Sequence, residues 1–290
     1  MIKIFTDTSA NLTRRLVKQH DITVVQFPYF VDGEEMVEDL NAEFDGAAFY
    51  NAMRSGADIK TSMINQQTFA KAFEAELSAG NDIVYVGMSG GISGTARSAE
   101  LAAEEMSAIY PERRIAVIDT KAASLGEGLV ALHAARLASE GGSFDQVAQA
   151  ACDNSLIMHQ YFTVEDLKYL QKGGRISKVT AFMGNMLNVK PLLRGEDGKI
   201  VLFEKVRGRR KSLEALAQKY AELVSDKSLP VGIAHGDCPE DADKLLDKLR
   251  SSGFCGEVVN VCYEPVTGSH VGPGTVALFF YGPQHEDFTF

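Results

Sequence analysis

A turn rich in glycine and serine, set between an apolar run and a long helical pattern, constrains the fold of this chain more than any other segment. Residues 82–88 are apolar and rich in β-branched side chains, as in a buried parallel strand. From Ala96 to Ile109, small and apolar residues recur at helical spacing. The turn between them, Ser89–Thr95, therefore predicts a strand–turn–helix unit of an α/β protein.

The same turn has the chemistry of an anion-binding site. The first N–H groups of a helix have no partner inside the helix, and the helix dipole favours negative charge in front of them. Ser93 and Thr95 add hydroxyl donors at this position. The alternative is that Ser93 only caps the helix, a role for which serine is preferred. The turn alone leaves both interpretations open.

The glycine pattern does not match a nucleotide-binding loop. A Walker loop ends in Gly-Lys-Ser/Thr, and no lysine lies between Ile83 and Arg113. The first strand–helix turn, Thr6–Leu12, lacks the G-x-G-x-x-G pattern of dinucleotide-binding proteins. We therefore expect no ATP site, no cofactor and, without an obvious carboxylate cluster, no metal.

The composition excludes further classes of protein. With 290 residues, of which 45% are hydrophobic, the chain can form two domains. Its net charge of −10 disfavours binding to nucleic acid or anionic membranes. We expect neither a membrane span nor a signal peptide, because no apolar run is long enough and the N-terminus leads directly into a strand pattern. Four cysteines without C-x-x-C spacing are typical of reduced thiols in the cytoplasm.

The order of strand and helix patterns divides the chain into two expected domains. In residues 1–158, strand and helix patterns alternate, which predicts an α/β domain with a mostly parallel sheet and helices on both faces. Residues 159–290 predict an α+β domain with a largely antiparallel sheet. The expected strands are 2–6, 22–27, 83–88 and 115–119 in the first domain and 160–164, 199–207, 231–234, 257–263 and 275–281 in the second.

Polar turns follow several of the expected strands in the first domain. Hydroxyl residues occur at 7–9, 61–62, 89–95 and 119–120. In open α/β sheets, ligands bind at the carboxyl ends of the strands. This gathering favours anion binding over simple capping. The alternative, that turns after strands are polar in any case, stays open.

The second domain contains two more glycine-rich segments. Gly268–Thr275 surrounds His270, whose imidazole can donate a hydrogen bond to an oxyanion, and glycines let a backbone approach a ligand closely. A lone histidine is more often structural, so His270 alone does not identify a site. Residues 172–177 place Arg175 after a short helical run.

Taken in order, these segments resemble the DegV family of fatty-acid-binding proteins. Two positions differ from the usual family pattern. Val271 stands where threonine is common, and Thr6-Asp7-Thr8 replaces Ser-Asp-Ser; neither change removes an expected carboxylate donor. The matching segments are 6–9, 60–62, 93–95, 119–128, 167–177, 187–192 and 269–274, which together extend over nearly the whole chain.

The resemblance implies a two-domain DegV-like fold with one long-chain fatty acid between the domains, its tail buried and its carboxylate at the seam. Arg175 and Gly272 are expected near the polar end. The resemblance also implies a bacterial carrier without catalytic residues, which presents the acid to a separate ATP-dependent fatty acid kinase that forms acyl-phosphate for phospholipid synthesis. The implied carboxylate-binding residues are Thr61, Ser62, Ser93, Gly94, Thr95 and His270.

Burial of the tail supplies the binding energy in this interpretation. Each buried methylene contributes roughly 0.8 kcal/mol, so a tail of about sixteen carbons offers on the order of 10 kcal/mol before ordering costs. Residues 180–189 form an apolar pattern with little charge, for which ordinary core packing is the alternative. The candidate tail-lining residues are Phe162, Phe182, Met183, Met186 and Leu187.

A dense basic cluster occupies residues 205–211 of this otherwise acidic chain. The resemblance implies that it contacts the kinase through Lys205, Arg207, Arg209 and Arg210, whereas the simpler alternative is a solvated loop and helix start. Nucleic acid is disfavoured because the cluster is short and has no interleaved aromatic residues. Two other functions stay open: an enzyme that uses His270 on a small carbonyl or phosphorylated metabolite, and a regulator, for which no helix-turn-helix pattern is found.

Overall fold

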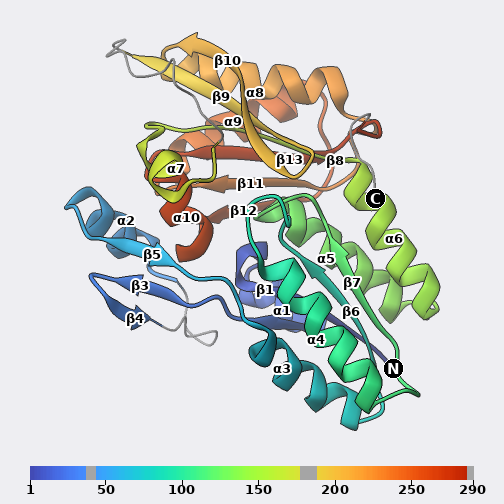
Figure 1. Ribbon diagram of the computed structural model, residues 1–290. Helices are drawn as coiled ribbons and strands as arrows, with labels where there is room; N and C mark the ends of the chain where they lie inside the picture. Colours follow the sequence, from blue (N-terminus) through green and yellow to red (C-terminus); the bar gives the residue numbers. More distant parts are fainter. Residues whose placement is uncertain (37–43, 177–187, 286–290) are drawn as a thin grey trace. The chain divides into compact units, whose positions relative to one another are not determined.

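The computed structural model describes residues 1–36, 44–176 and 188–285, which form two compact units (Figure 1). Unit 1 consists of Met1–Phe44 and Ile59–Leu156. Unit 2 consists of Asp45–Asp58 and Ile157–Phe290.

Unit 1 contains a four-stranded sheet in the order β2-β1-β6-β7. All of its pairings are parallel, which confirms the predicted parallel sheet. The central strand β6 is fully buried from Ile83 to Val86, because a parallel strand covered on both faces must be apolar along its length. The strands are β1 (Ile2–Asp7), β2 (Ile22–Val25), β6 (Asp82–Gly87) and β7 (Ile115–Asp119).

The helices of unit 1 pack on this sheet in two pairs, α3 with α4 and α5 with α6. Helix α3 begins after Asn65, whose side chain accepts a hydrogen bond from the Thr68 N–H. Its buried face places Phe69 and Phe73 against Tyr85 of β6, with ring centroids 5.0 and 6.5 Å from that ring. The helices are α1 (Arg14–Gln19), α3 (Gln66–Ser78), α4 (Thr95–Ile109), α5 (Leu125–Ser139) and α6 (Phe144–Leu156), with a 3₁₀ turn η1 (Thr8–Ala10) after β1.

A second, small sheet in unit 1 was not predicted from the sequence. It is antiparallel, in the order β4-β3-β5, and consists of β3 (Tyr29–Val31), β4 (Glu34–Met36) and β5 (Ile59–Thr61). Asp32 and Gly33 both have positive φ, as a tight hairpin between β3 and β4 requires. Tyr29 pairs with Thr61, so this sheet sets the position of Thr61.

Unit 2 is built on a six-stranded sheet in the order β10-β9-β8-β13-β11-β12. Only β11 and β12 pair in parallel, so the predicted, largely antiparallel sheet is confirmed. Leucines of α8 and α9 pack on it to form the core of the unit. The strands are β8 (Met158–Thr163), β9 (Val189–Glu196), β10 (Lys199–Arg207), β11 (Val231–His235), β12 (Val258–Cys262) and β13 (Val276–Tyr281); the later helices are α7 (Lys168–Gly173), α8 (Arg209–Leu223), α9 (Pro239–Ser251) and α10 (Pro265–Val271).

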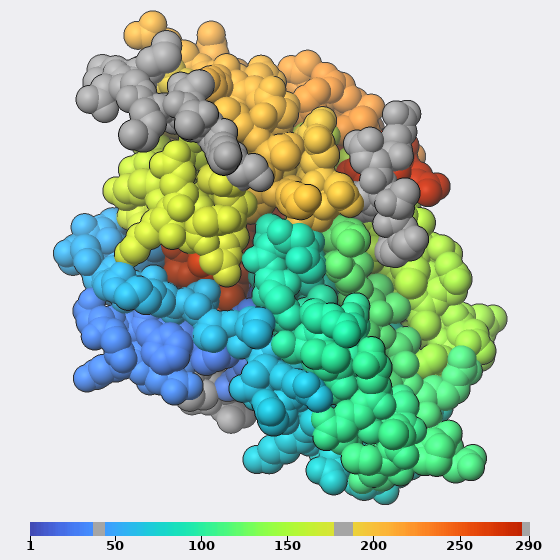
Figure 2. All heavy atoms as spheres, viewed as in Figure 1, coloured from blue at the N-terminus to red at the C-terminus, as the bar shows by residue number. Residues whose placement is uncertain are grey.

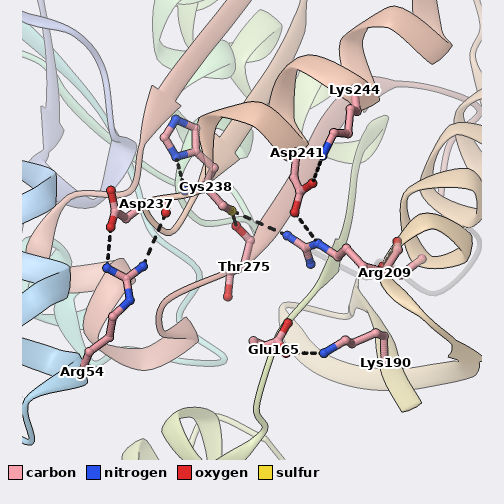
Figure 3. Close-up of polar contacts among 11 residues, drawn as sticks. Arg54, Glu165, Lys190, Arg209, Asp237, Cys238, Asp241, Lys244 and Thr275 are labelled. Carbon is pink, nitrogen blue, oxygen red and sulfur yellow. Dashed lines mark hydrogen bonds and ion pairs between the residues drawn. The ribbon is translucent and has the colours of Figure 1, made fainter. Parts of the chain in front are cut away.

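Helix α2 (Gly46–Arg54) belongs to unit 2, although the sequence assigned all of residues 1–158 to the first domain. Tyr50 is fully buried, and its hydroxyl donates to the Tyr263 carbonyl at 3.2 Å. Arg54 pairs with Asp237 at 2.5 Å (Figure 3). This part of the prediction is wrong because helical periodicity shows which residues share a face, but not which sheet that face covers.

Candidate functional site

The turn before α4 is held by hydrogen bonds to Ser89. The backbone N–H groups of Ile92 and Ser93 donate to the Ser89 carbonyl at 3.2 and 3.1 Å. Gly94, not Ser93, takes the N-cap position of α4, and no side chain caps the helix there. Ser93 therefore does not occupy the N-cap position, although its hydroxyl accepts from the first N–H of the helix.

The hydroxyls of Ser93 and Thr95 form a pair beside the helix start. Their oxygens lie 2.9 Å apart, and Ser93 Oγ also accepts from the Thr95 N–H at 3.3 Å. Helix α4 has 15 residues and no acidic side chain in its first turn. Its N-terminal N–H groups and dipole therefore present a favourable environment for an anion.

A hydrogen bond joins this turn to the segment after β5. The Ile64 N–H donates to Thr95 Oγ1 at 3.3 Å, so the chain that carries Thr61 and Ser62 is tied to the start of α4. The Ser62 N–H donates to the Pro28 carbonyl at 3.0 Å, which fixes the other side of the segment. Unit 1 thus ties the segment that follows Thr61 and Ser62 to the start of α4.

In unit 2, the predicted glycine-rich loop around His270 is largely a helix. Helix α10 begins after Glu264, whose carboxylate accepts from the Thr267 N–H at 2.6 Å, and Pro265 occupies its first turn. His270 lies in the last turn of this helix. The Glu-Pro start is the signal that would have predicted α10, because proline is favoured in the first turn.

His270 packs against the end of α7. A Cβ on Gly173 would overlap Nδ1 of the His270 ring, so this contact requires glycine. The Arg175 guanidinium donates to the Gly173 carbonyl, which places it close to the ring. Burial and the nearby Arg175 charge lower the pKa of His270 to about 4. The imidazole is therefore neutral at pH 7 and offers one N–H donor.

The glycines around His270 accommodate side chains of the same unit. A Cβ on Gly268 would overlap the Tyr50 hydroxyl, and one on Gly272 would overlap the Tyr169 ring. Gly272 also has a φ of +82°, which few other residues adopt. Packing against tyrosines therefore requires glycine at positions 268 and 272, and the expectation that Gly272 lies near the polar end of a ligand stays a prediction.

Of the predicted tail-lining residues, the structure describes only Phe162. This residue lies in β8, paired with Ala277 of β13 and Leu193 of β9, and it is buried in unit 2. The other candidates, Phe182, Met183, Met186 and Leu187, lie outside the described residues.

The predicted basic cluster is only partly a surface feature. Lys205, Arg207 and Arg210 are exposed where β10 leads into α8, the orange segment in Figure 2. Arg209 instead faces α9: its Nε donates to Asp241 at 2.7 Å, and only 21% of its side chain is exposed (Figure 3). Gly208, with a φ of +92°, turns the chain between β10 and α8. Arg209 therefore pairs with α9, whereas the resemblance implied that it contacts a partner protein.

The sequence reasoning missed a buried carboxyl pair, Asp7 and Glu127, whose exposed fractions are 1% and 0%. Tyr85 donates its hydroxyl proton to Asp7 Oδ2 at 2.6 Å, and Thr6 donates to Glu127 Oε1 at 2.9 Å. A charged residue in the otherwise apolar first half of α5 was the signal for this pair.

The Ser9 hydroxyl lies between the two carboxyl groups. It is hydrogen-bonded to Asp7 and lies 2.9 Å from Glu127 Oε2, but it has one proton to donate. Burial raises the pKa of Asp7 as well, but Asp7 also accepts from the Ser9 N–H at 2.9 Å and from Tyr85, so its carboxylate form has more hydrogen-bond donors than that of Glu127. Ser9 then donates to Asp7, and a protonated Glu127 donates to Ser9. Burial and the charge of Asp7 raise the pKa of Glu127 well above its usual range, which agrees with this assignment.

Within residues 1–36, 44–176 and 188–285, no group of three or more His, Cys, Asp or Glu side chains could hold a metal ion. No helix in that part of the chain is both long and apolar enough to cross a membrane. None of the four cysteines, which all lie in the same described ranges, forms a disulfide.

Comparison with known proteins agrees with the sequence resemblance. Residues 1–282 match a family model described as an uncharacterised protein of the DegV family. A DegV domain-containing protein of Clostridium perfringens is 37% identical over 285 residues, which cover 98% of this chain and 98% of that protein. The resemblance derived from the ordered motifs is therefore confirmed.

Solved structures share the fold over almost the full chain. A Thermus thermophilus DegV family protein, described as fatty-acid binding, is 28% identical and has a TM-score of 0.86, with 97% of this chain and 99% of that chain covered. A stearic acid-binding protein from Eubacterium ventriosum is 26% identical, with a TM-score of 0.83 and coverage of 96% and 97%.

Proposed function

Because the chain belongs to the DegV family, we propose that it binds one long-chain fatty acid. The observation that carries the proposal is the start of α4, where the Ser93 and Thr95 hydroxyls lie together and the first helical turn has no acidic side chain. The fatty-acid binding described for the Thermus and Eubacterium proteins supports it.

The donor set suits a carboxylate on a long apolar tail. An ionised group removed from water needs several hydrogen bonds at once. In the proposal, the hydroxyls of Thr61 and Ser93 donate to the carboxylate, and the family resemblance adds His270 as a donor and Arg175 near the polar end. The neutral imidazole of His270 acts as an N–H donor. A pKa near 4 makes it a weak base at pH 7, which disfavours the alternative of an enzyme with His270 as general base.

Binding is tested with protein purified under gentle conditions. Native mass spectrometry should detect a bound fatty acid, and delipidated protein should bind palmitate or stearate in a titration. Ser93→Ala should weaken binding by about 1–3 kcal/mol, the cost of leaving a charged acceptor one donor short. Ser78→Ala, which removes an exposed hydroxyl at the end of α3, is the matched control and should bind normally. Protein that is purified without a bound fatty acid and binds neither palmitate nor stearate would contradict the proposal.

We further propose that the chain carries the acid to a separate kinase instead of phosphorylating it. Its turns have no Walker sequence, and Lys205 and Arg207 form an exposed basic edge on an acidic protein. Charge reversal at these two positions should leave acid binding intact and impair acyl-phosphate formation with an added fatty acid kinase. Lys199→Glu, at the other end of β10, is the control. Normal acyl-phosphate formation by the double variant would contradict this role for the basic edge.

A further inference from the structure

Exposed methionines are a notable feature of the described surface of unit 1. Methionine is usually a core residue, as Met53 and Met106 are here. Met36 and Met63, however, are 39% and 52% exposed. Both lie on or next to the small sheet, whose strands β3 and β5 are blue and light blue in Figure 2. Both side chains therefore reach the surface, where dissolved oxidants can contact them.

Met63 lies at the helix start to which the proposed function assigns the carboxylate. It follows Ser62 directly, and the next residue is tied to Thr95 by the Ile64 hydrogen bond. Its sulfur lies over Gly94, because a Cβ on that glycine would be 2.7 Å from Sδ. Gly94 is the N-cap of α4. An apolar thioether thus covers a cluster of hydrogen-bond donors.

We propose that Met63 is an oxidation site that regulates this helix start: hydrogen peroxide converts its thioether to a sulfoxide, and the sulfoxide weakens fatty-acid binding. This inference deepens the proposed function and rests on it. A sulfur lone pair attacks one peroxide oxygen, the O–O bond breaks and an S–O bond forms. The departing oxygen leaves as water after it takes up the proton from the transferred oxygen. The sulfur is oxidised by two electrons, and the peroxide is reduced by two.

The effect on binding follows from the change in hydrogen-bonding capacity. A thioether sulfur is a weak acceptor and leaves the N–H and hydroxyl donors around Gly94 to a ligand. A sulfoxide is polar, and its oxygen is a good acceptor on the same flexible side chain. The positive end of the α4 dipole attracts that oxygen. The oxidised side chain therefore competes with the carboxylate for the same donors.

The test is a titration with palmitate before and after limited peroxide treatment, with peptide mass spectrometry to measure sulfoxide at Met63 and Met36. Oxidation should lower affinity about tenfold, as expected when a ligand loses one hydrogen bond to competition. Met63→Leu keeps an apolar side chain of similar size, so its own affinity before treatment is the reference, and that affinity should not change after treatment. Met36→Leu is the matched control, because β3 separates β4 from β5, and it should remain as sensitive as the wild type.

Two further measurements separate the site from general damage. Methionine sulfoxide reductases should restore binding in oxidised wild type. Met63→Gln, which places an amide oxygen acceptor at this position without oxidant, should bind more weakly than Met63→Leu in untreated protein. Full oxidation of Met63 with unchanged affinity, or equal sensitivity of Met63→Leu and wild type, would overturn the inference. Absence of binding in untreated wild type would instead contradict the proposed function.

Discussion

Glutamine in place of Glu127 should be tolerated at neutral pH, whereas alanine at this position should strongly destabilise unit 1. A protonated glutamate and a glutamine have the same shape and the same pattern of one acceptor and one donor. In Glu127→Gln, the amide oxygen accepts from Thr6 and the amide nitrogen donates to Ser9, as the wild-type carboxyl does. The expected cost is below about 1 kcal/mol, because no buried polar group loses its partner.

The alanine variant loses both partners and the volume of the side chain. Thr6 is left without an acceptor in a fully buried position, and Ser9 without a donor. An unpaired buried polar group costs about 1–3 kcal/mol, and a cavity the size of the missing side chain adds a similar amount. The expected loss is therefore about 3–5 kcal/mol. Asp7→Asn is the complementary test and should also destabilise, because its amide nitrogen cannot accept from Ser9 or Tyr85.

The pH dependence has a definite sign. The pKa of Glu127 is higher in the folded protein than in the unfolded chain, so proton binding favours the folded state. This stabilisation is complete below the unfolded pKa of about 4.3 and is lost as the pH rises through the raised folded pKa. Wild-type stability should therefore fall on the alkaline side, and Glu127→Gln should show a weaker fall.

The chain contains no tryptophan, so urea unfolding is best followed by far-UV circular dichroism, together with amide exchange in β1 and β6 to report on unit 1 alone. The reasoning fails if Glu127→Gln is as unstable as Glu127→Ala at pH 7. It also fails if both wild type and Glu127→Gln lose stability equally at high pH. The first result would mean that Glu127 is charged in the folded protein, and the second that another group, such as the buried Asp7, causes the alkaline loss.

Three further predictions concern unit 2. Tyr50→Phe removes the hydrogen bond to the Tyr263 carbonyl and should lower the free energy of unfolding by about 1 kcal/mol in urea; an unchanged value would mean that water replaces the hydroxyl. The pKa of His270 is lowered to about 4, so the unfolded chain binds the proton more strongly and unit 2 should lose stability as the pH falls from about 6.5 towards 4. Thermal unfolding should show a smaller acid loss in His270→Gln, and an identical loss in both proteins would contradict this effect. Arg209→Ala should destabilise more than Arg207→Ala by about 1 kcal/mol, because it removes a partly buried hydrogen bond to Asp241, which then keeps only Lys244 as a partner; equal melting curves would show that the Arg209–Asp241 pair contributes nothing.

The sequence predicted a strand correctly where the apolar composition of its residues reflects their burial. The apolar run around Ile83 marks a strand covered on both faces, and the alternation of strands and helices marks parallel pairing. The small sheet was missed because β3, β4 and β5 have three residues each, too short to show a period. Strand β9 was missed because Pro191 disfavours a strand prediction, although it pairs along β10.

The candidate site was predictable in its residue types but not in its geometry. Hydroxyls near a helix start could be recognised at Ser93, but the link from Ile64 to Thr95 joins segments 31 residues apart and depends on tertiary structure. Arg209 and Arg210 are neighbours in sequence, yet one faces α9 and the other solvent. Both lie in the first turn of α8, where one step along the helix rotates the side chain by roughly 100°, and charge patterns do not show which position faces α9.

Because Asp45–Asp58 belongs to unit 2, the gene cannot be divided at one point into a segment for each unit. The chain changes unit at 44/45, 58/59 and 156/157, so no single cut yields two intact folding bodies. A fragment that begins at Ile157 would leave the Tyr263 carbonyl without its donor and Gly268 uncovered. Recombination at a single junction would therefore separate segments that fold into the same unit. The two units must evolve and be expressed together in one chain.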